Sequence, residues 1–209
     1  MDSSRRLEEI FSHFPGIGPR QARRFVYHLM NKSPDSIKEF ILLVGEVKKS
    51  TNECKQCHRF FIQNSRFTLN KTKLHMCEIC RDLNRDQTTL MIVARDSDFE
   101  TIEKCGVYNG LYFILGGTVP ILDKDPEKRI RLRALLDRIS IDRNLKEIIL
   151  SLSTTPDGEH TTDIVKDSIS HIRGNKEIKA TILGRGLSTG AELEYADSET
   201  IKRALENRV

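Results

Sequence analysis

The first fifty residues place apolar side chains at helical spacing. Residues 5–13 and 20–30 each carry apolar positions three or four residues apart, which is typical of one buried helical face. Ser33 and Pro34 predict an N-cap and a first helical residue, opening a third helix that reaches about Val47. The apolar positions of the first two helices are Leu7, Ile10, Phe11, Ala22, Phe25, Val26, Leu29 and Met30. The N-terminal part is therefore predicted to be all-helical.

From residue 90 onward, short apolar runs alternate with helical patterns. The apolar runs, read as strands, are 90–94, 111–115, 147–152 and 178–183. The helical patterns between them are 99–104, 128–139 and 161–172, and a last helix is predicted over 198–207. This alternation is typical of right-handed crossovers. It predicts an α/β domain with a mainly parallel sheet flanked by helices.

Residues 48–89 are polar and contain two CxxC pairs. Cys54 and Cys57 form one pair, Cys77 and Cys80 form the other, and 19 residues separate them. Each pair folds into a knuckle that directs two thiolates at one point, and two knuckles complete the tetrahedron that Zn²⁺ prefers. Because no ligand position is left for water, we predict one structural zinc ion per chain. The alternative is four free cysteines at a coincidental spacing.

Other residues near the pairs leave further alternatives open. His58 and His75 flank the pairs, and each could replace a cysteine as ligand or be an ordinary surface histidine. The fifth cysteine, Cys105, is expected to be a small buried residue at a helix end. Because the segment has little core of its own, metal binding is expected to supply most of its folding free energy, roughly 10–16 kcal/mol in comparable zinc peptides.

A glycine turn joins the first two helices and predicts a DNA-binding hairpin. Gly16 and Gly18 leave the backbone N–H groups open to a phosphate, and the next helix adds its positive N-terminal end. Arg20, Arg23 and Arg24 lie off the apolar face and can pair with neighbouring phosphates, without reading base sequence. The alternative is a plain helical hairpin.

Charge and hydropathy bear on partners and compartment. Residues 1–89 hold 16 Lys and Arg against 10 Asp and Glu, whereas residues 90–209 hold 18 against 20. A basic N-terminal part suits an anionic partner, although ordinary solvated charge is the alternative. No apolar run is long enough to span a membrane and the N-terminus shows no secretory signal. We therefore expect a cytoplasmic, nucleoid-associated protein without a membrane partner.

The order of these parts resembles the bacterial RecR family of recombination proteins over almost the whole chain. The residues that carry the resemblance are Phe14-Pro15-Gly16-Ile17-Gly18-Pro19-Arg20 with Ala22, Arg24 and His28; Cys77 and Cys80 with Arg85-Asp86; and Gly116-Gly117 with Pro120-Ile121. The most specific string is Gly186-Leu187, Gly190, Leu193-Glu194-Tyr195-Ala196-Asp197, Thr200, Ala204-Leu205 and Arg208.

The resemblance implies a domain organisation and a set of partners. It implies a helix–hairpin–helix region (1–50), a four-cysteine zinc finger (51–88), a Toprim domain (89–185) and a C-terminal signature segment with a helix (186–209). It also implies a ring-like homo-oligomer, typically a tetramer, that can encircle duplex DNA. RecO and RecF are the implied partners in loading recombinase at gapped DNA.

The chain departs from the family pattern between the cysteine pairs. The stretch from about 63 to 75 looks like an insertion, and it carries Arg66, Lys71 and Lys73. It is expected to be either a solvated loop or an extra contact for DNA or a partner.

A second departure concerns catalysis. Toprim enzymes hold Mg²⁺ with an acid at the end of the first strand and a later acidic pair. Here Asp157 and Glu159 match the later pair, but Ala94 followed by Arg95 occupies the first position. The chain is therefore expected to be a non-catalytic DNA clamp, not an enzyme.

Three readings of the remaining acids stay open. Asp157 and Glu159 could bind a partner protein, hold a metal weakly, or complement a helix dipole. Asp96 and Asp98 could partly replace the missing acid, which would favour the alternative of a metal-dependent Toprim nuclease or strand-transfer enzyme.

Overall fold

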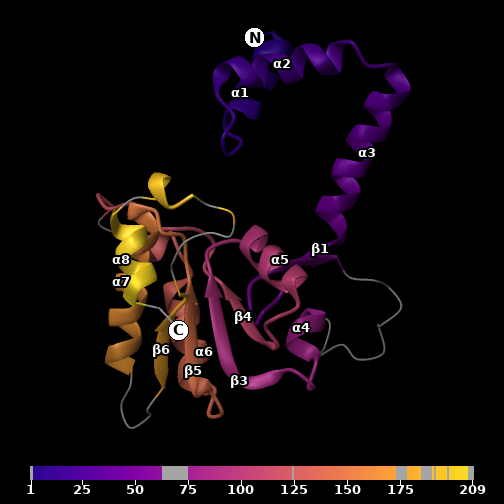
Figure 1. The fold of residues 1–209 in the computed structure, drawn as a ribbon. Coiled ribbons are helices and arrows are strands. Elements are labelled where there is room, and N and C mark those ends of the chain that lie inside the picture. The colour runs from indigo at the N-terminus through magenta and orange to yellow at the C-terminus, as the bar shows by residue number, and fades with distance from the viewer. Residues whose placement is uncertain are drawn as a thin grey trace. The chain divides into compact units, whose positions relative to one another are not determined.

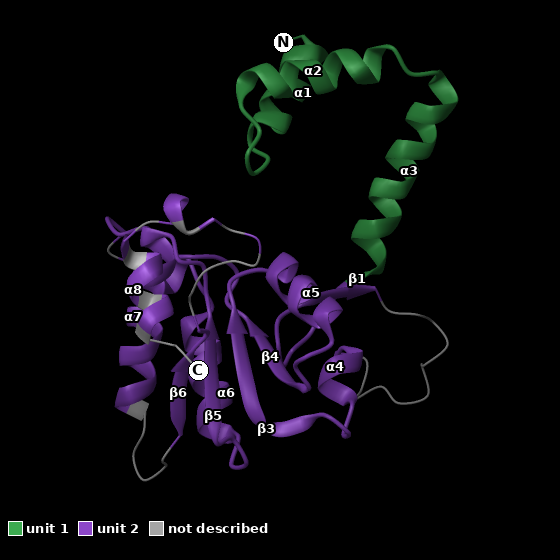
Figure 2. Cartoon of the chain, viewed as in Figure 1, with its two compact units in different colours: residues 1–51 green, residues 52–209 purple. Residues whose placement is uncertain are grey.

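The computed structural model describes residues 2–62, 75–123, 125–172, 178–184, 190, 192–196 and 198–206. The chain forms two compact units, Met1–Thr51 and Asn52–Val209, which are coloured separately in Figure 2. The finer boundaries near residues 88 and 185 stay predictions. The insertion near 63–75 falls almost entirely outside the described residues, as do Gly186, Leu187, Asp197 and Arg208 of the C-terminal signature.

The N-terminal unit is helical, as predicted. Its elements are α1 (Ser3–Ser12), α2 (Pro19–Met30) and α3 (Pro34–Ser50). Ser33 caps α3, since its side chain accepts a hydrogen bond from the Ser36 N–H, and Pro34 follows at the first turn. Ala22 and Val26 of α2 are buried against α1. The α1–α2 hairpin therefore has a small apolar core.

The second unit contains a four-stranded parallel sheet, which confirms the predicted fold class (Figure 1). Its strands are β3 (Asp86–Val93), β4 (Gly110–Ile114), β5 (Glu147–Ser151) and β6 (Lys179–Ile182), in the order β4-β3-β5-β6. The helices of this unit are α4 (Glu78–Arg81), α5 (Asp96–Cys105), α6 (Leu132–Ile141), α7 (Pro156–Ile172) and α8 (Ser198–Glu206). Short 3₁₀ helices span Pro126–Lys128 and Leu193–Tyr195.

The two faces of the sheet pack against different partners. Along β4, Leu111 and Phe113 share a buried cluster with α6 and α7. Tyr112 and Ile114, on the opposite face, share a second cluster with Phe99 of α5 and with the cysteine segment. Successive side chains of a strand point to opposite faces, so an almost continuous apolar run supplies both layers.

The starts of α6 and α7 differ most from the prediction. The pattern predicted a helix from residue 128, but α6 begins at Leu132, because the Arg131 N–H donates to the Leu115 carbonyl at 2.8 Å. The pattern predicted another from residue 161, but α7 begins at Pro156. Proline fits a first helical turn, so the helix starts well before its apolar face does.

The expectation that Cys105 is buried was wrong. Cys105 is exposed at the end of α5, and its thiol donates to the Thr101 carbonyl. Cysteine is usually buried, but Cys105 lies on the polar face of an amphipathic helix. The face of the helix, and not the residue type, decides its exposure here. Among the described residues, no helix has the length and apolarity needed to cross a bilayer.

Candidate metal centre and nucleic-acid interface

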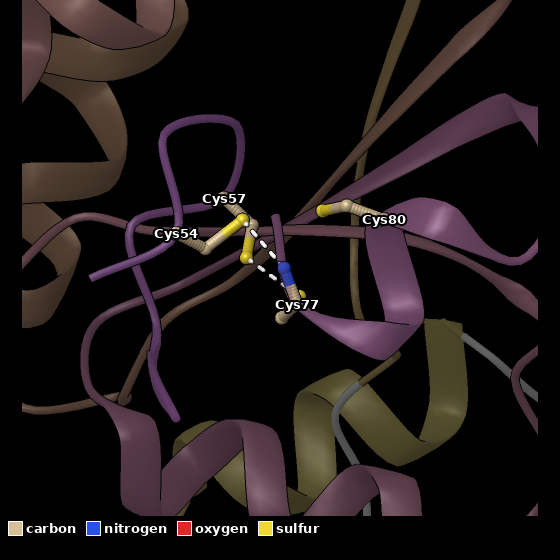
Figure 3. Close-up of side chains that lie close together, drawn as sticks. All are labelled: Cys54, Cys57, Cys77 and Cys80. Carbon is tan, nitrogen blue, oxygen red and sulfur yellow. Dashed lines mark hydrogen bonds between the residues drawn. The ribbon is translucent and has the colours of Figure 1, made fainter. Parts of the chain in front are cut away.

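The four cysteines of the CxxC pairs converge in one buried cluster (Figure 3). Their sulfur atoms all lie within 4.8 Å of one another, and those of Cys57 and Cys77 are 3.6 Å apart. A tetrahedron with Zn–S bonds of about 2.3 Å places its sulfur atoms roughly 3.8 Å apart. The cluster therefore has the size and the donor set of a closed four-thiolate metal site.

The first knuckle lies between two short strands, β1 (Thr51–Glu53) and β2 (Phe60–Ile62). The Cys54 N–H donates to the Arg59 carbonyl, and the His58 N–H donates to the Cys54 carbonyl, both at 2.9 Å. His58 has a φ of 61°, in the left-handed region, which costs a non-glycine residue roughly 1–3 kcal/mol. The surrounding contacts must offset this cost for the turn to persist.

The second knuckle is built on the start of a helix. Cys77 is the N-cap of α4, and Cys80 lies within it. The Cys77 N–H donates to the sulfur of Cys54 at 3.4 Å, which joins the two knuckles directly. Amide donors aimed at a cysteine sulfur favour its thiolate form, the form that binds metal.

Neither flanking histidine joins the cluster. His58 Nδ1 lies 2.8 Å from Glu53 Oε1, and its ring packs edge-on against Phe113. His75 is exposed, and its backbone carbonyl accepts a hydrogen bond from the Lys55 N–H. Among the described residues, the metal-ligating cluster consists of the four cysteines alone.

The thiols affect one another's proton affinity. Hydrogen bonds with neighbouring thiols, that of Cys57 first, lower the pKa of Cys54. The hydrogen bond with Cys54 is the first cause that raises the pKa of Cys57, and burial adds to it. Thiols this close share their protons as one group, and a cation bound among them would displace those protons.

The cysteine segment, which was expected to have little core of its own, shares the core of the sheet. The four cysteines belong to the same buried cluster as Phe61, Ile79, Met91, Val93, Phe99, Tyr112 and Ile114. The Ile114 N–H of β4 donates to the Cys57 carbonyl at 2.8 Å, so the knuckle also covers the backbone of an edge strand. The four cysteines therefore pack on one face of β3 and β4, as part of the core of the sheet.

The predicted DNA hairpin has an open glycine turn. Gly16 has a φ of +75°, which favours glycine, and no atom lies within 4 Å of a Cβ built on Gly16 or Gly18. Gly18 is the N-cap of α2 and provides no side-chain cap. Pro19, the first residue of α2, has no N–H, so the N–H groups of Arg20 and Gln21 are the ones available to an anion.

The three arginines of the hairpin differ in their surroundings. Arg23 lies 3.5 Å from Glu8 of α1, which offsets part of its charge. Arg24 donates only a long 3.4 Å hydrogen bond to Gln21. Within the described part of the chain, no carboxylate pairs with Arg20 or Arg24, so these two are the stronger candidates for phosphate ligands.

At the carboxyl edge of the sheet, the acids near the first strand are already engaged. β3 ends at Val93 and is followed by Ala94. Asp96 accepts the Phe60 N–H at 2.8 Å, and Asp98 accepts the Arg95 N–H at 2.9 Å. Both carboxylates therefore have backbone partners, and nothing in the described contacts turns them toward a cation site.

Asp157 and Glu159 both lie in the first turn of α7. Asp157 Oδ1 accepts the Ile121 N–H at 3.3 Å and so helps to hold the loop that follows β4. The glycine between the two acids has a packing reason, because a Cβ on Gly158 would overlap the Ser153 carbonyl. The hydrogen bond explains the presence of Asp157 in this Asp-Gly-Glu motif, and the lack of space explains Gly158.

Sequence reasoning missed the long-range contacts that anchor the cysteine segment. Arg131 Nε lies 3.3 Å from Glu53, and Arg138 donates to the Gln56 carbonyl at 2.6 Å. Arg59 lies over the Phe99 ring at 4.4 Å. These pairs are far apart in sequence and follow no motif, so no local pattern could have predicted them.

Known proteins resemble this chain over nearly its full length. Residues 88–183 match the family model described as Toprim domain, and residues 186–209 match RecR, C-terminal. A relative named recombination protein RecR from Lactobacillus helveticus is 33% identical over 202 residues, covering 97% of this chain and 94% of the relative. The relatives of that name from Streptococcus gordonii and Gloeothece citriformis are 34% and 32% identical, each with the same coverage of both chains.

We predict that Cys57→Ser removes the metal from the purified protein and lowers its melting temperature. One ligand is lost from a cluster on which a sheet face also packs. Metal content by mass spectrometry and thermal unfolding measure the two effects. Cys105→Ser is the matched control and should change neither quantity, because Cys105 is exposed and outside the cluster. Full metal content and an unchanged melting temperature in Cys57→Ser contradict the assignment.

Proposed function

The chain belongs to the RecR family of recombination proteins, and we propose that it acts in recombinational DNA repair as a non-catalytic DNA clamp. The observation that carries the proposal is the open glycine turn between α1 and α2, in a chain that matches RecR relatives over 97% of its length. The clamp would help to load recombinase at gapped DNA together with RecO- and RecF-type partners.

The hairpin would bind the sugar-phosphate backbone. A phosphate oxygen can approach the turn closely because Gly16 and Gly18 have no side chains and open space around them. The uncapped N-terminus of α2 adds N–H donors and a positive dipole end, and Arg20 and Arg24 add charge-assisted hydrogen bonds. Contacts of this kind position a protein on DNA without reading its sequence.

The four-cysteine cluster would bind one structural Zn²⁺. Four thiolates satisfy the tetrahedral preference of zinc and leave no open position for a reacting water molecule. The bound ion would fix the β1–β2 knuckle and the start of α4 against the sheet.

The exposed apolar surface of α3 supports a homo-oligomer, which we propose to be a tetramer. Every described side chain of this helix is exposed or half-buried, although its middle is strongly apolar. The exposed apolar residues are Phe40, Ile41, Leu42, Leu43, Val44 and Val47. Such a contiguous surface is rare on monomers, and a second copy of the chain would cover it.

The carboxyl edge of the sheet would bind a partner protein and not a catalytic metal. Asp157 is occupied with the loop after β4, and Ile121 and Leu122 on that loop are exposed. With Ala94 in place of the first acid and Arg95 beside it, the edge lacks the acidic triad that Toprim phosphoryl transfer requires. We therefore favour partner recruitment over weak metal binding at Asp157 and Glu159.

We predict that the double substitution Arg20→Glu with Arg24→Glu lowers DNA affinity at least 10-fold near 0.1 M salt. It should also reduce the slope of log K against log salt by about 2, because about one counterion per lost phosphate contact is no longer released. Titration of labelled duplex and gapped DNA at several salt concentrations measures both. Arg143→Glu with Lys166→Glu, on the second unit, is the control. An unchanged salt slope in the hairpin variant argues against this interface.

The clamp and nuclease hypotheses differ in metal-dependent cleavage. We expect no cleavage when the protein is incubated with labelled duplex, gapped and single-stranded DNA in Mg²⁺ or Mn²⁺, because the first metal-binding acid is absent. Gel analysis of the products tests this expectation. Cleavage that needs the metal and disappears in Asp157→Asn establishes the nuclease instead.

We also predict that Leu43→Glu shifts the protein to a smaller oligomer, since a carboxylate cannot be buried in an apolar interface without a partner. Light scattering coupled to size exclusion gives the mass of each species. Lys48→Glu, a charged position on the same helix, should keep the wild-type mass. A wild-type monomer, or a Leu43→Glu species of wild-type mass, overturns the assignment of α3 as the interface.

A further inference from the structure

Glu53 and His58, the two residues that flank the first knuckle, connect it to the four-stranded sheet. Glu53 immediately precedes Cys54, and His58 immediately follows Cys57. Oε1 of Glu53 lies 2.8 Å from Nδ1 of His58 and 3.3 Å from Nε of Arg131. One carboxylate oxygen therefore closes the knuckle across its base and joins it to the residue that precedes α6.

Arg131 lies at the carboxyl end of β4. Its guanidinium donates to the Ile114 carbonyl at 3.4 Å, and its backbone N–H donates to the Leu115 carbonyl at 2.8 Å. Gly116 has a φ of +96°, and Nη1 of Arg131 lies 2.6 Å from where a Cβ on Gly116 would be. The guanidinium thus fills the space that the missing side chain of Gly116 leaves open.

The loop that begins at Gly116 leads to the carboxyl edge of the sheet. The Gly116 N–H donates to the Ala94 carbonyl at 2.9 Å, next to the position where Toprim enzymes carry the first acid. Further along, the Val119 N–H donates to the buried Thr161 hydroxyl at 2.8 Å, and Ile121 donates to Asp157. A series of contacts therefore links Arg131, through the loop 116–121, to the carboxyl edge proposed above to recruit partners.

We propose that Glu53 is a positioning residue that couples metal occupancy of the four-cysteine cluster to the conformation of the loop 115–121. The proposal rests on metal binding by that cluster. The knuckle contacts β4 directly, through the Cys57 carbonyl on Ile114 and the His58 ring on Phe113. Glu53 adds an indirect link to the end of β4, through Arg131. Metal binding fixes the conformation of the knuckle and with it the position of Glu53. Glu53 in turn holds the Arg131 guanidinium against Gly116, which restricts the conformation of the loop.

The cluster has a second ion pair that supplies a matched control. Arg59, next to His58, pairs with Glu78 of α4 at 2.9 Å. Glu78 precedes Ile79 and lies as close in sequence to a cysteine as Glu53 does, but it links only the two knuckles. Glu78→Gln therefore removes one ion pair from the cysteine segment without removing the link to β4.

Coupling between two sites is reciprocal, so it can be measured from either end. We expect Glu53→Gln and Arg131→Gln each to lower zinc affinity about 10-fold, the low end of the effect of residues that orient metal ligands. The double variant should lose no more zinc affinity than either single variant, because both substitutions break the same Glu53–Arg131 contact. Competition with a chromogenic zinc chelator gives the affinities.

The loop itself is followed by hydrogen–deuterium exchange of the full-length, zinc-loaded protein. We expect amides of residues 115–121 to exchange several-fold faster in Glu53→Gln and Arg131→Gln than in wild type, and at the wild-type rate in Glu78→Gln. If Glu53→Gln does not fold, Arg131→Lys tests the same link, since it keeps the charge but loses the planar fork.

The outcomes separate this proposal from the one on which it rests. Wild-type protein that binds no zinc overturns the metal assignment and the coupling together. If the wild-type protein binds zinc normally, any of three results overturns the coupling alone. These are unchanged loop exchange in Glu53→Gln, an equal increase of loop exchange in Glu78→Gln, or additive losses of zinc affinity in the double variant.

Discussion

The second unit depends on the burial of four thiols within 4.8 Å of one another, on the same apolar cluster that covers one face of the sheet. Buried polar groups need partners, and sulfur atoms crowded to this degree are best satisfied by a shared cation. The β1–β2 knuckle, the start of α4, and the Phe99 and Ile114 contacts all converge on this point. Without a cation among them, these thiols would repel one another once ionised.

The carboxyl edge of the sheet has Ala94 where Toprim enzymes carry the first acid, and contacts of other residues hold this edge in place. In a Toprim enzyme a bound Mg²⁺ helps to organise this edge. Here the Arg131 guanidinium lies against Gly116, and the Asp157 carboxylate holds the Ile121 N–H. A cationic side chain and hydrogen bonds thus hold this edge together, which is consistent with the non-catalytic role proposed above.

The sequence predicted what depends on local pattern, and the structure added what depends on distant pairs. Helical spacing located α1 and α2, the Ser33–Pro34 cap located the start of α3, and alternation located all four strands of the sheet. The CxxC spacing identified the cysteines that cluster. Cys105 was misplaced because residue type was weighed above its position on the helix. Glu53 and Arg131 could not be found, since 77 intervening residues separate two side chains that belong to no motif.

The electrostatics of the cysteine cluster also bear on the proposed DNA surface. Four thiolates around one Zn²⁺ would carry a net charge of −2, which would repel phosphate over roughly the 8 Å screening distance of physiological salt. Arg59 is already paired with Glu78, while Arg138 and Arg81 donate to the Gln56 and Cys77 carbonyls beside the cluster. These cations and Lys55 would offset part of that charge. The hairpin has the opposite balance, with Arg20 and Arg24 beside an uncapped helix N-terminus. The charges therefore favour the hairpin over the cysteine cluster as the proposed surface for DNA.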